Sequence, residues 1–360
     1  MTGELKSLTA ARGLAAWLVV LYHIRSGANW APDWLFAFAS KGYLAVDFFF
    51  LLSGFVIYLS AHRAMLRDGT AAIAPFLIRR FARIYPLYGF MLALTLLFVL
   101  LLHATGDDPQ GYPMRELPLH IAMLQNWGFT EKLAWNHPAW SISAEMAAYL
   151  LFPIIILGTP ISETRRPNLL AAMILTLATL FVILHFNGET TLGRDIPHFG
   201  LLRCLAEFTC GVLLCAFWLR GPDGEVYAFG LSLGGVAMFW GLWLTGLASE
   251  LWAFPAGAAC LILALAHSSA FRHNPLHIKP LITLGEISYG TYLSHFMLYV
   301  WFKIIFVADP HAVPPILMLS FLALTLAASF LLHHWIEKPG RDWAMAFRKR
   351  LPPRLASRPS

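Results

Sequence analysis

Runs of about twenty apolar residues recur along this chain, and they restrict its fold more than any other feature. An α-helix rises about 1.5 Å per residue, so roughly twenty residues cross the hydrocarbon core of a bilayer. Ten runs are predicted to be transmembrane helices, at residues 7–24, 42–60, 83–103, 139–158, 169–186, 199–219, 226–246, 249–267, 283–306 and 315–336. Composition agrees, because 58% of the 360 residues are hydrophobic and only 13% are charged. The sequence therefore predicts an all-α polytopic integral membrane protein.

The distribution of basic residues predicts the orientation. If the N-terminus is cytoplasmic, most of the 26 Lys and Arg residues fall on the inner side, and a minority that includes Arg203 falls on the outer side. The positive-inside rule favours this arrangement, with both termini cytoplasmic. It also accounts for the pI near 9.2, so contact with membrane lipid is expected and nucleic-acid binding is not. We expect a membrane domain at 1–341 and a basic cytoplasmic tail at 342–360.

Ionisable residues inside the predicted helices are the first candidates for function, because burying them in a membrane is costly. Five are expected at a similar depth in the outer half of the membrane: His23, Asp47, Glu145, Glu207 and His295. Structural bonds between helices are the alternative explanation. We predict that His23 is a general base oriented by Glu145 or Asp47, since a carboxylate can fix the tautomer of an imidazole. His295 and Glu207 are candidates for acceptor binding or proton relay.

Arginines form a second cluster at the inner side. Arg79, Arg80 and Arg83 open one predicted helix, and Arg12 lies at the same depth. Anchoring by the positive-inside rule is one explanation, and a binding site for phosphates is the other. Arg12 and His23 are eleven residues apart, so they share a helix face about 17 Å apart. Coenzyme A, with phosphates at one end and a thioester at the other, would span that distance.

Six segments, in this order, carry a family resemblance: "ARGLAAWLVVLYH", "VDFFFLLSGFVI", "RRFARIYP", "WSISAEMAAYLLFP", "SYGTYLSHF" and "IEKPGR". Together they resemble acyltransferase family 3, the integral-membrane O-acyltransferases. The resemblance implies transfer of an acyl group, most simply acetyl, from cytoplasmic acyl-CoA to a hydroxyl of an extracytoplasmic sugar or small secondary metabolite. It implies a catalytic role for His23, donor binding by Arg12, Arg80 and Arg83, and a place in the bacterial inner membrane. A fused hydrolase-like domain, which some members carry, is not expected here.

Several alternatives stay open at this stage. A proton-coupled transporter of a small polar solute would also place carboxylates and histidines inside the membrane, although no paired broken helices are evident. Direct attack is favoured over a transient acyl-enzyme. No metal site is expected, since the four cysteines lack the spacing of metal ligands. Gly54, with Ser53, is expected to allow close helix packing, and His333 is expected at the cytoplasmic surface.

Overall fold

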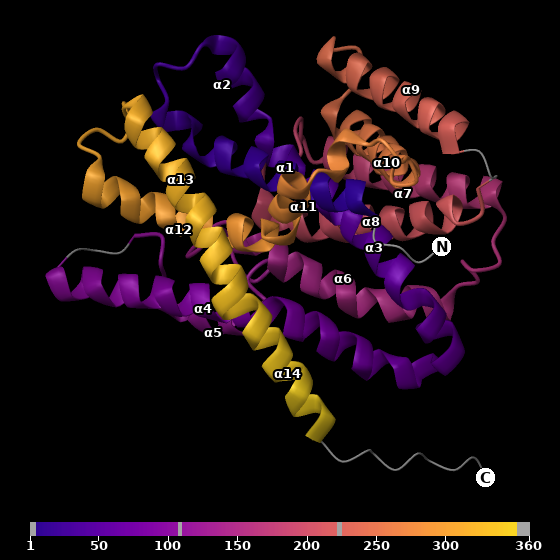
Figure 1. Ribbon diagram of the computed structural model, residues 1–360, viewed down its shortest axis with the longest axis horizontal. Helices are drawn as coiled ribbons and strands as arrows, with labels where there is room; N and C mark the ends of the chain where they lie inside the picture. Colours follow the sequence, from indigo (N-terminus) through magenta and orange to yellow (C-terminus); the bar gives the residue numbers. More distant parts are fainter. Residues whose placement is uncertain (1–4, 107–109, 222–224, 351–360) are drawn as a thin grey trace.

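The computed structural model describes residues 5–106, 110–221 and 225–350, and this part of the chain is almost entirely helical (Figure 1). Apart from one isolated bridge between Ala28 and Ala312, it contains no β-structure. The helices are α1 (Lys6–Ile24), α2 (Asp33–Ser40), α3 (Ala45–Asp68), α4 (Ile73–Thr105), α5 (Leu117–Ile121), α6 (Ala139–Gly158), α7 (Arg166–Phe186), α8 (Ile196–Trp218), α9 (Glu225–Leu244), α10 (Glu250–Ser268), α11 (Lys279–Glu286), α12 (Ser288–Phe306), α13 (Pro315–Leu332) and α14 (Lys338–Arg350).

Each of the ten predicted membrane segments is helical over most of its length, and the segment 283–306 covers the end of α11 and all of α12, which confirms the fold class. Among the described residues, eight stretches are long and apolar enough to cross a membrane, and one of them, Asp33–Thr105, contains both α3 and α4. The remaining predicted segment is α12, which carries buried polar side chains such as Ser288, Thr291 and His295 and is not among the eight. The exact number of spans therefore stays approximate.

Helix α1 crosses the middle of the molecule and packs on α3, α10, α11 and α12. The crossing with α11 is close because glycines meet there. A Cβ on Gly285 would lie 1.9 Å from the carbonyl oxygen of Thr9, and one on Gly13 would lie 2.6 Å from the Gly285 nitrogen. This contact brings the C-terminal end of α11 against the first half of α1, where Arg12 is located.

Helices α3 and α8 form a second close crossing, which carries buried ionisable residues. A Cβ on Gly54 would lie 2.0 Å from the carbonyl oxygen of Phe208, and one on Gly211 would lie 2.0 Å from that of Leu51. The packing role expected for Gly54 is therefore confirmed. Small residues let membrane helices approach closely, and here they bring Asp47 on α3 next to Arg203 on α8.

Two peripheral features complete the fold. The described part of the connection between α4 and α6 packs back onto the helices, with Trp135 buried and the Asn136 amide donating to the carbonyl oxygen of Leu293 at 2.8 Å. Helix α14 continues from α13 and crosses α4, where Gly340 lies against Pro86 (Figure 1). The first nine residues of the predicted basic tail are thus helical, and 351–360 lie outside the described residues.

Candidate active site

An open cavity of about 920 Å³, its mouth included, lies between α1, α3, α4, α6 and α12, and we call it the arginine cavity. Three of the four predicted arginines line it: Arg12, Arg80 and Arg83. Glu145 is the one carboxylate in its lining. Three guanidinium groups against one carboxylate leave the lining with an excess of positive charge.

Arg12 is held at the junction of α11 and α12. Its Nη2 donates to the carbonyl oxygen of Gly285 at 2.7 Å, and its Nε donates to the Ser288 hydroxyl at 3.1 Å. Carbonyl groups at the C-terminal end of a helix carry partial negative charge, so they favour a cation there. Arg12 is therefore fixed in orientation by backbone contacts while it lines the cavity.

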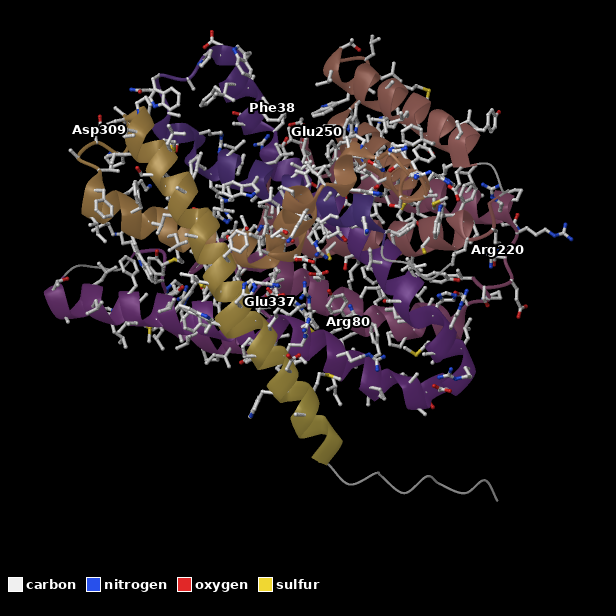
Figure 2. The ribbon with its side chains drawn as sticks, viewed as in Figure 1. Phe38, Arg80, Arg220, Glu250, Asp309 and Glu337 are labelled. Carbon is white, nitrogen blue, oxygen red and sulfur yellow. The ribbon has the colours of Figure 1, made fainter. Side chains whose placement is uncertain are left out.

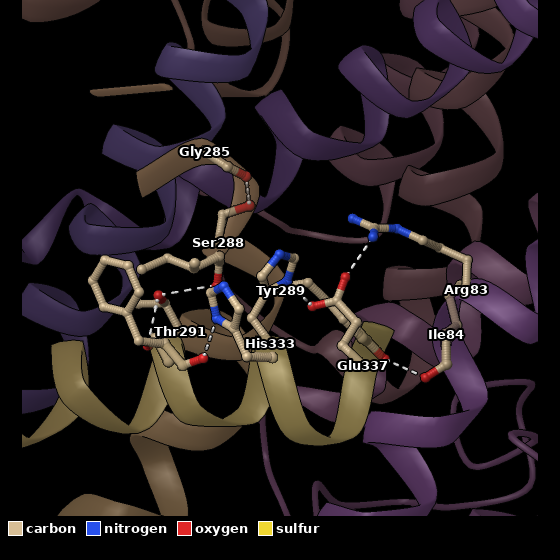
Figure 3. A network of polar contacts seen from close by, with 12 residues as sticks. Arg83, Ile84, Gly285, Ser288, Tyr289, Thr291, His333 and Glu337 are labelled. Atoms are coloured by element: carbon tan, nitrogen blue, oxygen red, sulfur yellow. Dashed lines mark hydrogen bonds and ion pairs between the residues drawn. The ribbon is translucent and has the colours of Figure 1, made fainter. Parts of the chain in front are cut away.

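Arg83 is fixed by the far end of the chain. It forms an ion pair with Glu337, which is 1% exposed. The other Glu337 oxygen accepts a hydrogen bond from His333 Nδ1 at 2.9 Å, as Figure 3 shows. Residues His333–Glu337 form a π-helical turn, a geometry often found at functional sites. His333 is therefore buried, and the expectation that it lies at the surface is wrong.

Of the three guanidinium groups in the cavity, that of Arg80 has the fewest polar contacts with the protein. Its Nε is buried and has no hydrogen-bond partner within the described residues, and the group lies 5.6 Å from the Phe76 ring. Figure 2 shows Arg80 and Glu337 near the middle of the molecule. Arg79 does not line the cavity. Adjacent helical residues point about 100° apart, and the cavity lies on the side of α4 that Arg80 and Arg83 share.

Glu145 belongs to the arginine cavity and not to the surroundings of His23. Its Oε1 accepts hydrogen bonds from Ser53 and from the Tyr149 hydroxyl, the latter at 2.7 Å. The depth estimate from the sequence placed Glu145 with His23, but the two residues line different cavities. Ser53 lines the same cavity as Glu145, so it has a polar contact in addition to its place next to Gly54.

A second cavity, of about 870 Å³ with its mouth, contains His23 near the opposite end of α1, and we call it the histidine cavity. Its lining includes Tyr22, Tyr43, His137, Trp140 and Arg203. His137 stacks on Phe296 with ring centroids 4.6 Å apart. Burial lowers the pKa of His137, so this ring adds no charge at neutral pH.

His23 is oriented by His295, and the hydrogen bonds define which nitrogen carries the proton. His295 Nδ1 donates to the carbonyl oxygen of Thr291 at 3.1 Å, so in the neutral ring Nε2 can only accept. That Nε2 lies 3.1 Å from His23 Nδ1, which also lies 2.9 Å from the carbonyl oxygen of Val19. His23 Nδ1 is thus the protonated nitrogen, shared between these two acceptors. The lone pair of His23 Nε2 is left for a substrate in the cavity.

The expected carboxylate partner of His23 is therefore replaced by a second histidine. Asp47 is occupied elsewhere, because its Oδ1 accepts from Arg203 Nε and Nη2 at 3.1 and 2.6 Å. Glu207 lies against this pair, and all three side chains are at most 2% exposed. Only Asp47 is ion-paired with Arg203, and both Glu207 oxygens and Arg203 Nη1 have no hydrogen-bond partner within the described residues.

Sequence reasoning missed three contributors to these cavities, and two of them left a signal. Arg203 lies within a predicted span, four residues before Glu207, so its position inside the membrane was a signal that it needs a buried carboxylate, which in the structure is Asp47. Glu337 follows the predicted end of the last span by one residue. Tyr149 follows Glu145 by four residues, but nothing in its sequence context separates it from an ordinary packed tyrosine.

Comparison with known proteins now identifies the family. Residues 5–334 match the family model for the acyltransferase domain of family 3. The chain belongs to acyltransferase family 3. Among its relatives, the acyltransferase MdmB of Streptomyces mycarofaciens is 30% identical over 93% of this chain and 91% of its own length. The O-acetyltransferase OatA of Staphylococcus aureus is 24% identical over 94% of this chain and 57% of its own. No solved structure matches this acyltransferase.

Membership of this family decides between the two function classes left open by the sequence. The protein is a membrane O-acyltransferase, which needs an acyl donor and a hydroxyl-bearing acceptor. Within the described residues, no three His, Cys, Asp or Glu side chains are grouped so as to hold a metal ion. The ionisable side chains in the linings of the two cavities are arginines, tyrosines, two histidines and Glu145.

Proposed function

We propose that this acyltransferase moves an acyl group, most simply acetyl, from acyl-CoA bound in the arginine cavity to a hydroxyl group bound in the histidine cavity. The observation that carries the proposal is the opposition of the two cavities along α1. One end presents three arginines, and the other presents a histidine with a free Nε2. The relative OatA is an O-acetyltransferase, which supports acetyl as the simplest acyl group.

The phosphates of CoA match the arginine cavity. Guanidinium groups bind phosphate oxygens through charge-assisted hydrogen bonds, and Arg80 Nε has no hydrogen-bond partner among the residues that the structure describes. Arg12 and His23 lie on one unbroken helix and are about 17 Å apart along its axis. The pantetheine arm of CoA would span this distance between the phosphates and the base. The positive-inside pattern supports a cytoplasmic arginine cavity, cytoplasmic termini and a location in the bacterial inner membrane.

The reaction we propose is direct attack by the acceptor. His23 Nε2 takes the proton of the acceptor hydroxyl while the oxygen attacks the thioester carbonyl carbon. The carbon–sulfur bond then breaks, and the proton on Nε2 passes to the sulfur, which leaves as the thiol of CoA. His295 acts through His23 as a positioning residue, because it holds the tautomer that exposes Nε2.

The acceptor is proposed to be a carbohydrate or a small secondary metabolite on the extracytoplasmic side. Trp140 and Tyr43 supply aromatic surface in the histidine cavity, and Arg203 lies there with an unpaired nitrogen. Aromatic faces and hydrogen-bond donors suit a molecule with several hydroxyl groups.

Thermal unfolding of the detergent-purified protein tests the donor. CoA should raise Tm more than dephospho-CoA, and dephospho-CoA more than pantetheine, because each step removes phosphates. Thiol release from acetyl-CoA, with methyl glucoside as acceptor, should depend on His23. If pantetheine stabilises the protein as well as CoA does, the arginine cavity does not bind phosphates and the proposal is wrong.

A further inference from the structure

The arginine cavity and the histidine cavity adjoin at two side chains, which we call the wall. Val46 on α3 and Tyr292 on α12 line both the arginine cavity and the histidine cavity, and among the described residues no other does. The three arginines at the donor end and His23 at the other lie on opposite sides of this wall. Val46 and Tyr292 therefore mark the place where the two cavities adjoin.

Tyr292 is held in place by one contact from each cavity. Its hydroxyl lies 2.7 Å from the Ser141 hydroxyl, which lines the arginine cavity. The same hydroxyl donates to the carbonyl oxygen of Pro138, at 3.1 Å, and Pro138 lines the histidine cavity. The ring packs edge-on against Phe49 with centroids 5.8 Å apart. The aromatic side of the wall is thus fixed by hydrogen bonds at its tip and by packing at its face.

We infer that Val46 and Tyr292 form the aperture through which the thioester enters the histidine cavity, and that they set the largest acyl group the enzyme transfers. The inference rests on the proposed function and deepens it. A short acyl group fits between a branched aliphatic side chain and a pinned ring, whereas each added methylene must displace one of them. In an apolar pocket one methylene is worth about 10–200-fold in discrimination.

Chain-length preference tests the aperture. Full-length protein in detergent is supplied with acetyl-, propionyl-, butyryl- or hexanoyl-CoA, and thiol release is measured with methyl glucoside as acceptor. Val46→Ala should raise kcat/KM for butyryl-CoA relative to acetyl-CoA by at least about tenfold, because it removes two methyl groups from the wall. Val46→Ile, which adds one methylene, should shift the preference the other way while CoA still raises Tm as in the wild type.

A matched control separates the aperture from general loosening of the donor cavity. Val56 lines only the arginine cavity, so Val56→Ala makes the same chemical change away from the wall. Its ratio of butyryl to acetyl transfer should stay at the wild-type value. If Val46→Ala and Val56→Ala have equal ratios of butyryl to acetyl transfer, Val46 does not limit the size of the acyl group and the inference is wrong.

Tyr292→Phe gives an independent test, because it keeps the ring and removes the hydroxyl that pins it. Without the hydrogen bonds that hold the ring, longer acyl groups should pass more easily, and kcat/KM for butyryl-CoA relative to acetyl-CoA should rise several-fold. No rise, together with an unchanged chain-length preference in Val46→Ala, would overturn the inference. Failure of the proposed function looks different, since the wild-type protein would then release no thiol from any acyl-CoA.

Discussion

The two cavities of this acyltransferase are built on the same helix but are held in opposite ways. In the arginine cavity, Arg83 is held by a buried carboxylate and Arg12 by the end of a helix. In the histidine cavity, His23 is held by a carbonyl oxygen and a second imidazole, neither of which carries a charge. Charges with fixed orientations suit the binding of a polyanion, and an uncharged histidine suits proton abstraction. Substitutions in one cavity should therefore change donor KM, and those in the other should change kcat.

The largest effect is expected from His23→Ala. General-base removal costs about 10²–10⁴ in rate, so kcat should fall by that factor. The Tm shift produced by CoA should stay near the wild-type value, because the arginine cavity is untouched. Steady-state thiol release and thermal unfolding measure the two quantities. A near-normal kcat in this variant would show that His23 is not the general base. The contrast between a donor-binding cavity and a catalytic cavity would then be wrong.

Arg80→Gln should produce the next largest effect, on the other side of the comparison. Losing a charge-assisted hydrogen bond of about 1.5–3 kcal/mol raises donor KM by about 10–150-fold, with a smaller change in kcat. Arg79→Gln is the matched control, since Arg79 is adjacent on α4 but does not line the cavity. A similar rise in both variants would mean that the effect comes from net charge and not from the cavity.

The same contrast explains what the sequence could predict. The apolar runs predict the ten helices, because helix length and bilayer thickness fix each other. The face shared by Arg12 and His23 follows from helix geometry alone, and α1 is unbroken between them. Glu145 could not be placed this way, because depth along a helix axis does not tell which neighbouring helix a side chain faces. Its contact with Ser53 follows from the rotation of α6 against α3, whereas Tyr149 lies one turn further along α6 itself.

The contact between His23 and His295 could not be predicted from the sequence for a related reason. Both histidines were singled out, but their contact depends on how α1 and α12 cross, and the five expected ionisable residues separate into three clusters instead of one. The π-helical turn His333–Glu337 also has no simple sequence pattern. One extra residue in that turn directs Glu337 toward Arg83, whereas hydropathy locates only the end of the span.

His295 is expected to have a moderate effect on kcat. His295→Ala removes one of the two acceptors for His23 Nδ1 and leaves only the carbonyl oxygen of Val19, so the ring is held less firmly, and kcat should fall about tenfold with donor KM unchanged. His295→Gln keeps an acceptor oxygen and should recover part of the loss, with the pH dependence of kcat moved toward that of the wild type. If Gln and Ala behave alike in rate and pH profile, His295 only fills space.

The smallest effect on activity, with a measurable effect on stability, is expected at Arg83 and Glu337. Arg83→Gln leaves Glu337 buried with His333 as its remaining partner, so Tm should fall, and donor KM should rise only a few-fold because Arg83 is already neutralised by Glu337. Glu337→Gln removes the competing carboxylate and should leave donor KM equal to or below the wild-type value. The double variant should recover much of the Tm lost in Arg83→Gln, since no buried charge is then unpaired. If donor KM rises as steeply in Arg83→Gln as in Arg80→Gln, Arg83 binds phosphate despite its ion pair, and the contrast between a committed and an uncommitted arginine does not hold.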